Sequence, residues 1–399
     1  MPFVELNFST NEANQKFHQN LIQILERLYL PTYLINKLFD LDKTTWSQWK
    51  WYRKLTYCAH CVILLGIMSL TCLVIVLEPL YFHKTIDFRQ SCNSVALFAI
   101  RVQGFVAAIF LLIWNYYGYR VRFLRRLTNA GCGAGIINAR ERIERTNISL
   151  IVFIFITILV SSTFQLLHAF KVDTPLANDP IDKLGLLPII LLVICTLFCL
   201  TALMNSLSVI SIHFLIICAE YEKLADEFRE DLNTFQLPVV THYSHAHHNL
   251  WRLWTVVKSI MSYYQTFNLL SNMILFIYLF STVNFQTSWI DFGFGLYLAL
   301  FSLASIILPF LFVSSFRHAF KRLQIECLEL AASGKILHDG VYAFLPVLAS
   351  SIQRKIYRLR LFGLVDVNIR NLIKLLFLCV VVASVLRLLF NRNELNKIV

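Results

Sequence analysis

Apolar residues gather in seven long runs along this chain, and short polar segments separate the runs. A helix that crosses a membrane needs about 20 consecutive, mainly apolar residues. The runs are Tyr57–Leu80, Val95–Tyr117, Ile148–Phe170, Leu184–Cys218, Phe267–Ser288, Phe292–Phe316 and Leu372–Phe390. The fourth run is longer than a bilayer requires, and the charged segment 219–232 after it predicts that the same helix continues into the cytosol. The pattern predicts an all-α integral membrane protein with seven transmembrane helices.

Composition supports this fold class and removes one alternative. Hydrophobic residues make up 57% of the 399 residues and charged residues 15%, whereas soluble proteins are about 45–50% apolar and about 25% charged. The net charge of +12 is spread over the short segments between the apolar runs. No stripe of basic and aromatic residues typical of nucleic-acid binding is present. We therefore expect membrane lipids as partners and no nucleic acid.

The distribution of Lys and Arg predicts the orientation. Of the 36 such residues, 27 lie in the N-terminal segment and every second segment after it, and 6 lie in the segments between those. The remaining three, Arg101, Lys374 and Arg387, lie inside apolar runs. Positively charged residues concentrate on the cytosolic side, so the N-terminus is predicted to be cytosolic and the C-terminus extracellular. This is the reverse of a G-protein-coupled receptor, and the chain also lacks the Asn-Pro-x-x-Tyr and Asp-Arg-Tyr motifs of that class.

Two segments resemble a known family of membrane proteins. The stretch Arg358–Phe377, with Gly363, Asp366 and Asn368, is similar to the segment before the last helix of insect gustatory receptors. The stretch Asn249–Ser271 resembles the amphipathic lead-in to the fifth helix of the same family. Seven helices with an inside N-terminus also match, so the chain resembles a divergent gustatory receptor or a gustatory-receptor-like protein.

The last apolar run departs from the family signature, which is Thr-Tyr, five residues, then Gln-Phe. Aligned on Phe390, this chain has Val382 and Ala383 in place of Thr-Tyr and Leu389 in place of Gln. The departure makes a non-conducting chemoreceptor-like subunit an open alternative.

The resemblance implies a helical homo- or hetero-tetramer with related receptor subunits, gated by a small-molecule ligand and conducting cations in the plasma membrane. It divides the chain into five parts. These are a cytosolic segment (1–56), a six-helix ligand-binding region with cytosolic loops (57–316), a cytosolic anchor (317–371), a pore-lining seventh helix (372–390) and an extracellular tail (391–399).

Polar residues in the outer halves of the first six runs are candidates for a ligand pocket, because polar groups inside a membrane need a partner or water. They are Glu78, Arg101, Gln103, Gln165, His168, Tyr278, Asn284 and Tyr297. Glu78 and Arg101 lie near the outer ends of neighbouring runs and are suited to form an ion pair. Such a pair also has a purely structural interpretation, in which it neutralises two buried charges.

Arg387 raises a separate question in the seventh run. Val380, Ser384, Arg387 and Asn391 fall at i, i+4, i+7 and i+11 and form one stripe along a helix. If that stripe faced a four-fold axis, four guanidinium groups would ring the outer mouth and oppose cation passage. In the alternative, Arg387 reaches the lipid headgroups and has no role in conduction.

Four histidines, His242, His245, His247 and His248, lie in one segment predicted to be cytosolic. A solvated helix face is the favoured interpretation over a metal or pH-sensing site, because no Cys or carboxylate lies close by in the sequence to complete a ligand set. The Gly-rich stretch 129–145 lacks the Gly-Lys-Ser/Thr of a phosphate-binding loop. We expect no metal and no cofactor.

A transporter and an enzyme are the two other function classes on which the sequence bears. A transporter is the main alternative, although the two halves show no internal repeat of the kind common in transporters. An enzyme is disfavoured because no Ser/His/Asp or paired-carboxylate constellation recurs inside the apolar runs.

Overall fold

The fold is a bundle of long helices. The computed structural model describes residues 51–85, 92–119, 122–123, 126–127, 133–169, 186–231, 237–282, 289–333, 339–356, 360–361, 365–366 and 368–398. Its helices are α2 (Trp51–Thr85), α3 (Cys92–Tyr116), α5 (Ala134–Asn138), α6 (Arg140–Ala169), α7 (Leu186–Glu230), α8 (Leu237–Thr282), α9 (Trp289–Ala332), α10 (Asp339–Ile356) and α11 (Ile369–Ile398). Two short antiparallel strands, β1 (Arg360–Leu361) and β2 (Val365–Asp366), precede α11. The all-α prediction is confirmed.

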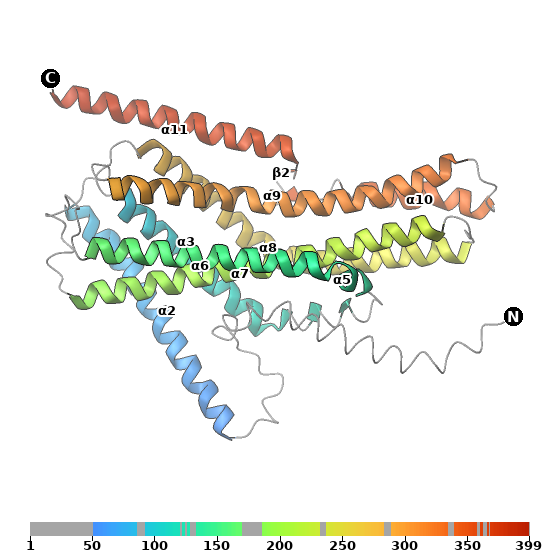
Figure 1. Cartoon of the computed structure of the whole chain (residues 1–399), viewed down its shortest axis with the longest axis horizontal. Coiled ribbons are helices and arrows are strands. Elements are labelled where there is room, and N and C mark those ends of the chain that lie inside the picture. The colour runs from blue at the N-terminus through green and yellow to red at the C-terminus, as the bar shows by residue number, and fades with distance from the viewer. Residues whose placement is uncertain are drawn as a thin grey trace.

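Three helices are much longer than a bilayer is thick. Helices α7, α8 and α9 contain 45, 46 and 44 residues, which corresponds to about 66–69 Å at 1.5 Å per residue. The hydrocarbon core of a membrane is about 30 Å thick. The predicted continuation of the fourth run into a charged extension is confirmed, because α7 is unbroken from Leu186 to Glu230. Figure 1 shows the far ends of these helices packed beside α10.

Six of the described helices are long and apolar enough to cross a membrane: α2, α3, α6, α7, α9 and α11. The predicted fifth span, which begins at Phe267, falls on the last part of α8 and on residues after Thr282 that lie outside the described part of the chain. The count of seven transmembrane helices and the orientation therefore stay predictions.

Helix α7 is the centre of the bundle and contacts α2, α3, α5, α6, α8 and α9. Its approach to α3 is very close at Gly104, where an added Cβ would overlap the backbone carbonyl of Cys199. Ala107 and Ala108, one turn further along α3, are fully buried. Small residues of this kind let two membrane helices pack backbone to backbone.

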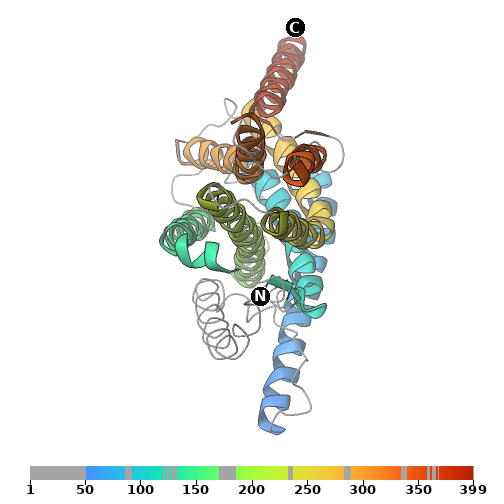
Figure 2. The ribbon, with the colours of Figure 1, turned by 90° about the vertical axis from the view of Figure 1, so that its right-hand side faces the viewer.

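Helices α2 and α11 lie at the periphery, on opposite sides of the bundle (Figures 1 and 2). Helix α11 contacts mainly α8 and a short part of α9. Only 17% of its apolar window is buried, against 50% for α7 and α9. Most of the last helix is therefore free of contacts within one copy of the chain.

The start of α11 is fixed by the two polar residues of the predicted pre-pore motif that the structure describes. The Asn371 backbone N–H donates to Asn368 Oδ1 at 2.7 Å, which is an N-cap, and the Asn371 side chain donates to the Asp366 carbonyl at 2.7 Å. Gly363 lies outside the described residues. Helix α11 begins at Ile369 and continues to Ile398, so it extends beyond both ends of the predicted seventh run.

Ion pairs join the extended part of α7 to its neighbours. Glu222 accepts from Arg142 of α6 at 2.7 Å, and Asp226 accepts from Arg322 of α9 at 2.5 Å. All four side chains are at least one-third exposed, so each pair stabilises the fold by less than about 1 kcal/mol. Their main effect is to fix which helices meet at this end.

The described part of the Gly-rich stretch begins at Gly133, which has a φ of 141° and precedes the five-residue helix α5. The backbone N–H of Ile136 donates to Glu220 Oε1 at 3.0 Å. A carboxylate of the protein thus occupies the position that a phosphate would need.

Candidate functional site

Arg101 is one of the largest fully buried side chains among the described residues, with 1% of its surface exposed. Its Nη1 donates to Thr196 Oγ1 on α7 at 3.0 Å, and the Thr196 hydroxyl donates in turn to the Leu192 carbonyl at 2.9 Å. The hydroxyl therefore accepts from the arginine and donates to its own helix. The side chain of Glu78, which was the expected partner, lies outside the described residues. The observed contact links α3 to α7 in the half of the bundle predicted to be external.

The other predicted ligand residues are only partly described. Gln103 is 1% exposed, and within the described part of the chain neither of its amide atoms has a hydrogen-bond partner. Tyr278 and Tyr297 are half-buried. The side chains of Gln165, His168 and Asn284 lie outside the described residues. Because four of the eight side chains lie outside the described residues, the outer pocket stays a prediction.

Three amides on α8 were missed by the sequence analysis. Gln265, Asn268 and Asn272 are 7%, 3% and 0% exposed. They lie at i, i+3 and i+7 and therefore share one face of the helix. The Asn272 amide donates to Asn268 Oδ1 at 2.9 Å. The sequence did contain a signal for this site. It was the helical spacing of three amides within and just after the segment that resembles the fifth-helix lead-in.

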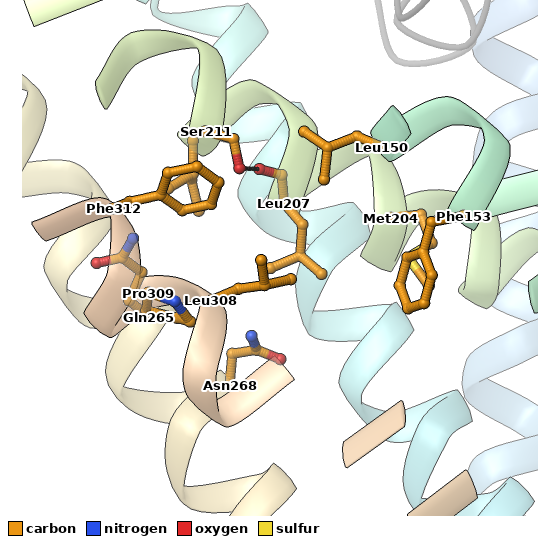
Figure 3. A pocket seen from close by; sticks show the side chains of 11 residues that line it. Leu150, Phe153, Met204, Leu207, Ser211, Gln265, Asn268, Leu308, Pro309 and Phe312 are labelled. Atoms are coloured by element: carbon orange, nitrogen blue, oxygen red, sulfur yellow. Dashed lines mark hydrogen bonds between the residues drawn. The ribbon is translucent and has the colours of Figure 1, made fainter. Parts of the chain in front are cut away.

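A pocket lies where this amide face meets α6, α7 and α9 (Figure 3). Its lining residues are Leu150, Phe153, Met204, Leu207, Ile210, Ser211, Gln265, Asn268, Leu308, Pro309 and Phe312. None of them belongs to the predicted ligand set. Leu150 follows the start of the third predicted run, Gln265 precedes the fifth, and Phe312 lies near the end of the sixth. In the predicted orientation all three positions are close to the cytosolic side.

The predicted pore stripe lies at the flank of the face by which α11 contacts the bundle. Cys379 and Ala383 are fully buried and mark that face. Val380 is 40% exposed, Ser384 is exposed and Arg387 is half-buried. The side chains of Phe390 and Asn391 lie outside the described residues. Within one copy of the chain, Val380 and Ser384 are open to a second molecule or to solvent.

The histidine segment is not uniformly solvated. His242, His245 and His248 are exposed, as expected. The expectation was wrong for His247, which is 1% exposed. It faces the interior because α8 here packs against the extensions of α7 and α9 and against α10. Among the described residues, no group of three His, Cys, Asp or Glu side chains is arranged to hold a metal ion.

The contacts of His247 assign its tautomer. Lys355 Nζ of α10 lies 3.1 Å from Nε2, and an ammonium can only donate, so Nε2 accepts and the ring proton is on Nδ1. The Tyr221 hydroxyl of α7 lies 3.4 Å from Nδ1 and donates to the His247 carbonyl at 3.3 Å. A neutral imidazole thus connects α7, α8 and α10.

We predict that His247 makes the stability of the contact between α7, α8 and α10 depend on pH. Burial, followed by the charge of Lys355, lowers the pKa of His247 from 6.5 to about 3. The folded form therefore resists protonation that the unfolded chain accepts, so stability is full above pH 6.5 and falls as the pH drops toward 3. Between pH 7.5 and 5.5 the loss should be about 1.4 kcal/mol, seen as a lower thermal midpoint in detergent.

The matched variants are His247→Asn and His245→Asn. The first should flatten the pH dependence of the midpoint, and the second, at an exposed histidine, should leave it as in the native chain. An unchanged pH dependence in His247→Asn would contradict the assigned environment.

Comparison with known proteins places the whole fold. No family model matches the sequence, and no curated protein matches it. Among solved structures, the chain is similar to the insect olfactory receptor OR5 from Machilis hrabei in complex with eugenol, with a TM-score of 0.67 and 14% identity over 92% of this chain and 99% of that chain. A second structure of the same receptor gives a TM-score of 0.66. The chain has the fold of an insect olfactory receptor.

This likeness extends over nearly the full length of both chains. At 14% identity it concerns the fold and not the site residues. The correspondence agrees with the all-helical membrane architecture predicted from the apolar runs.

Proposed function

We propose that the chain is a gustatory-type chemoreceptor, a subunit of a cation channel gated by small external chemicals such as tastants. The observation that carries the proposal is the match to an olfactory receptor over 92% of this chain and 99% of the other. The gustatory assignment rests on Arg358–Phe377 and Asn249–Ser271, which resemble that branch of the insect chemoreceptors.

The pore is assigned to α11, surrounded by copies of itself or of related subunits in a tetramer. Lipid contact suits the exposed apolar residues of α11, which include Phe377, Leu378, Val381, Val385 and Leu388. Arg387 lies on a different flank of the helix, and a cation inside a membrane helix faces a partner or water. A central aqueous axis satisfies both requirements.

Ligand binding is assigned to the bundle α3, α6, α7, α8 and α9. Helix α8 contacts α11, so a change in the packing of α8 reaches the pore helix directly. A ligand that binds the open arrangement more tightly shifts the population toward it. The olfactory receptor was solved with eugenol, and we assign ligands of similar small size to this chain in the plasma membrane.

Whole-cell recording together with tracer uptake tests this function. The chain is expressed with a related receptor subunit, or alone as Arg387→Gln, and exposed to a panel of small organic molecules. A cation current that appears only with an active molecule supports the channel. Accumulation of a labelled solute without current would favour the transporter alternative.

A further inference from the structure

The pocket between α6, α7, α8 and α9 has a buried floor and a half-buried rim. Met204, Ile210, Ser211, Gln265, Asn268 and Pro309 form the floor, and all are buried. Leu150 and Phe153 of α6, and Leu308 and Phe312 of α9, are half-buried. Figure 3 shows the two groups of rim side chains on opposite sides of the space, with Asn268 below Leu308. The pocket is therefore open to the outside between the rim side chains, and its walls are apolar.

The floor carries hydrogen-bonding groups that the described part of the chain leaves available. Among the described residues the Gln265 amide makes no hydrogen bond, and Asn268 accepts from Asn272 at Oδ1 while its Nδ2 makes none. Both side chains are more than nine-tenths buried. An amide without a partner in such a place is costly by about 1–3 kcal/mol, which favours a bound polar group.

The size of the cavity selects the polar group. Its volume is about 20 Å³, enough for about one water molecule or for one hydroxyl. An aromatic ring does not fit within it. An alkyl chain attached to the hydroxyl can instead lie across the half-buried rim, in the opening between α6 and α9. Only 24% of the apolar window of α6 is buried, so lipid borders this helix.

We propose that this pocket binds straight-chain aliphatic alcohols that enter from the bilayer. The hydroxyl bonds the amides of Gln265 and Asn268, and the alkyl chain packs on Phe153, Leu308 and Phe312. The site is separate from the predicted outer ligand pocket. Binding here does not depend on whether the chain conducts ions.

Photolabelling of the full-length chain in lipid nanodiscs tests the site. The probe is octanol that carries a diazirine on its chain, and adducts are located by mass spectrometry. We expect adducts on the peptides that contain Phe153 and Leu308–Phe312, competed by 1-octanol but not by octane at the same membrane concentration. Removal of both amides in Gln265→Leu/Asn268→Leu should lower this labelling about tenfold, as expected for about two lost hydrogen bonds.

Ser302→Ala is the matched control, because Ser302 is buried on the same helix two turns before Pro309 and its hydroxyl bonds only the Leu298 carbonyl among the described residues. It should label as the native chain does. If the double variant does not elute as folded protein, Leu308→Trp fills the opening and should abolish the same adducts.

Equal competition by octane and octanol, or adducts unchanged in both pocket variants, would overturn the alcohol site. Because labelling is read without current, these outcomes leave the proposed channel function untouched. Specific labelling in a chain that never conducts would count against the channel alone.

Discussion

Replacement of Gly104 by alanine is expected to lower the free energy of unfolding by about 3 kcal/mol, at the upper end of what overpacking costs. The added methyl group would meet the carbonyl oxygen, carbonyl carbon and Cβ of Cys199 on α7. Two of these atoms belong to the backbone, so relief requires α3 and α7 to separate. Both helices are central, and Ala107 and Ala108 would lose their packing as well. The measurement is the thermal midpoint and the yield of monodisperse protein in detergent.

Gly66 of α2 supplies the control, because an added Cβ there has no neighbour within 4 Å. Gly66→Ala should leave stability unchanged or raise it by up to about 1 kcal/mol, since alanine favours a helix over glycine. If Gly104→Ala and Gly66→Ala behave alike, the close approach of α3 and α7 is wrong.

Arg387→Gln is expected to raise the cation current of the homomer by about tenfold or more. At about 8 Å from a passing ion, one guanidinium opposes it by about 2 kcal/mol at an effective dielectric constant near 20, and 1.4 kcal/mol already corresponds to tenfold. Four such groups around one axis make the native homomer a poor cation conductor. Whole-cell recording at matched surface expression measures the change.

Two variants on the same helix separate charge from side-chain shape. Arg387→Lys keeps the positive charge and should stay as low as the native chain. Arg370→Gln removes an exposed charge at the other end of α11 and should have little effect. A large current in the native homomer, unaltered by Arg387→Gln, would assign Arg387 to the lipid headgroups instead.

The apolar runs were sufficient to predict the helices because burial in lipid requires continuous apolar sequence and internal backbone hydrogen bonds. They also predicted the extension of α7, where charges follow the run without a helix breaker. The end of α11 was not predictable in this way. It continues through polar residues beyond Phe390, and such residues favour a helix and a loop about equally when no partner is known.

The partners of buried polar groups were less accessible to sequence reasoning. Glu78 was chosen for Arg101 from depth alone, and its side chain lies outside the described residues. The bond from Arg101 to Thr196, 95 positions away on α7, could not be found from local spacing. The same limit applies to His247, whose exposure depends on α10 packing over α8. Local spacing predicts which residues share a helix face, but tertiary packing decides which face is inside. That is why the α8 amides were overlooked while the outer polar residues were chosen.

The position of the C-terminus relative to the membrane tests the central claim most directly. An epitope tag placed after Val399 is stained in intact and in permeabilised cells, with a tag before Met1 as the internal control. From the predicted seven-helix orientation we expect the C-terminal tag to stain in intact cells. The N-terminal tag should stain only after permeabilisation. Staining of the C-terminal tag only after permeabilisation would contradict the seven-helix arrangement and the chemoreceptor assignment with it.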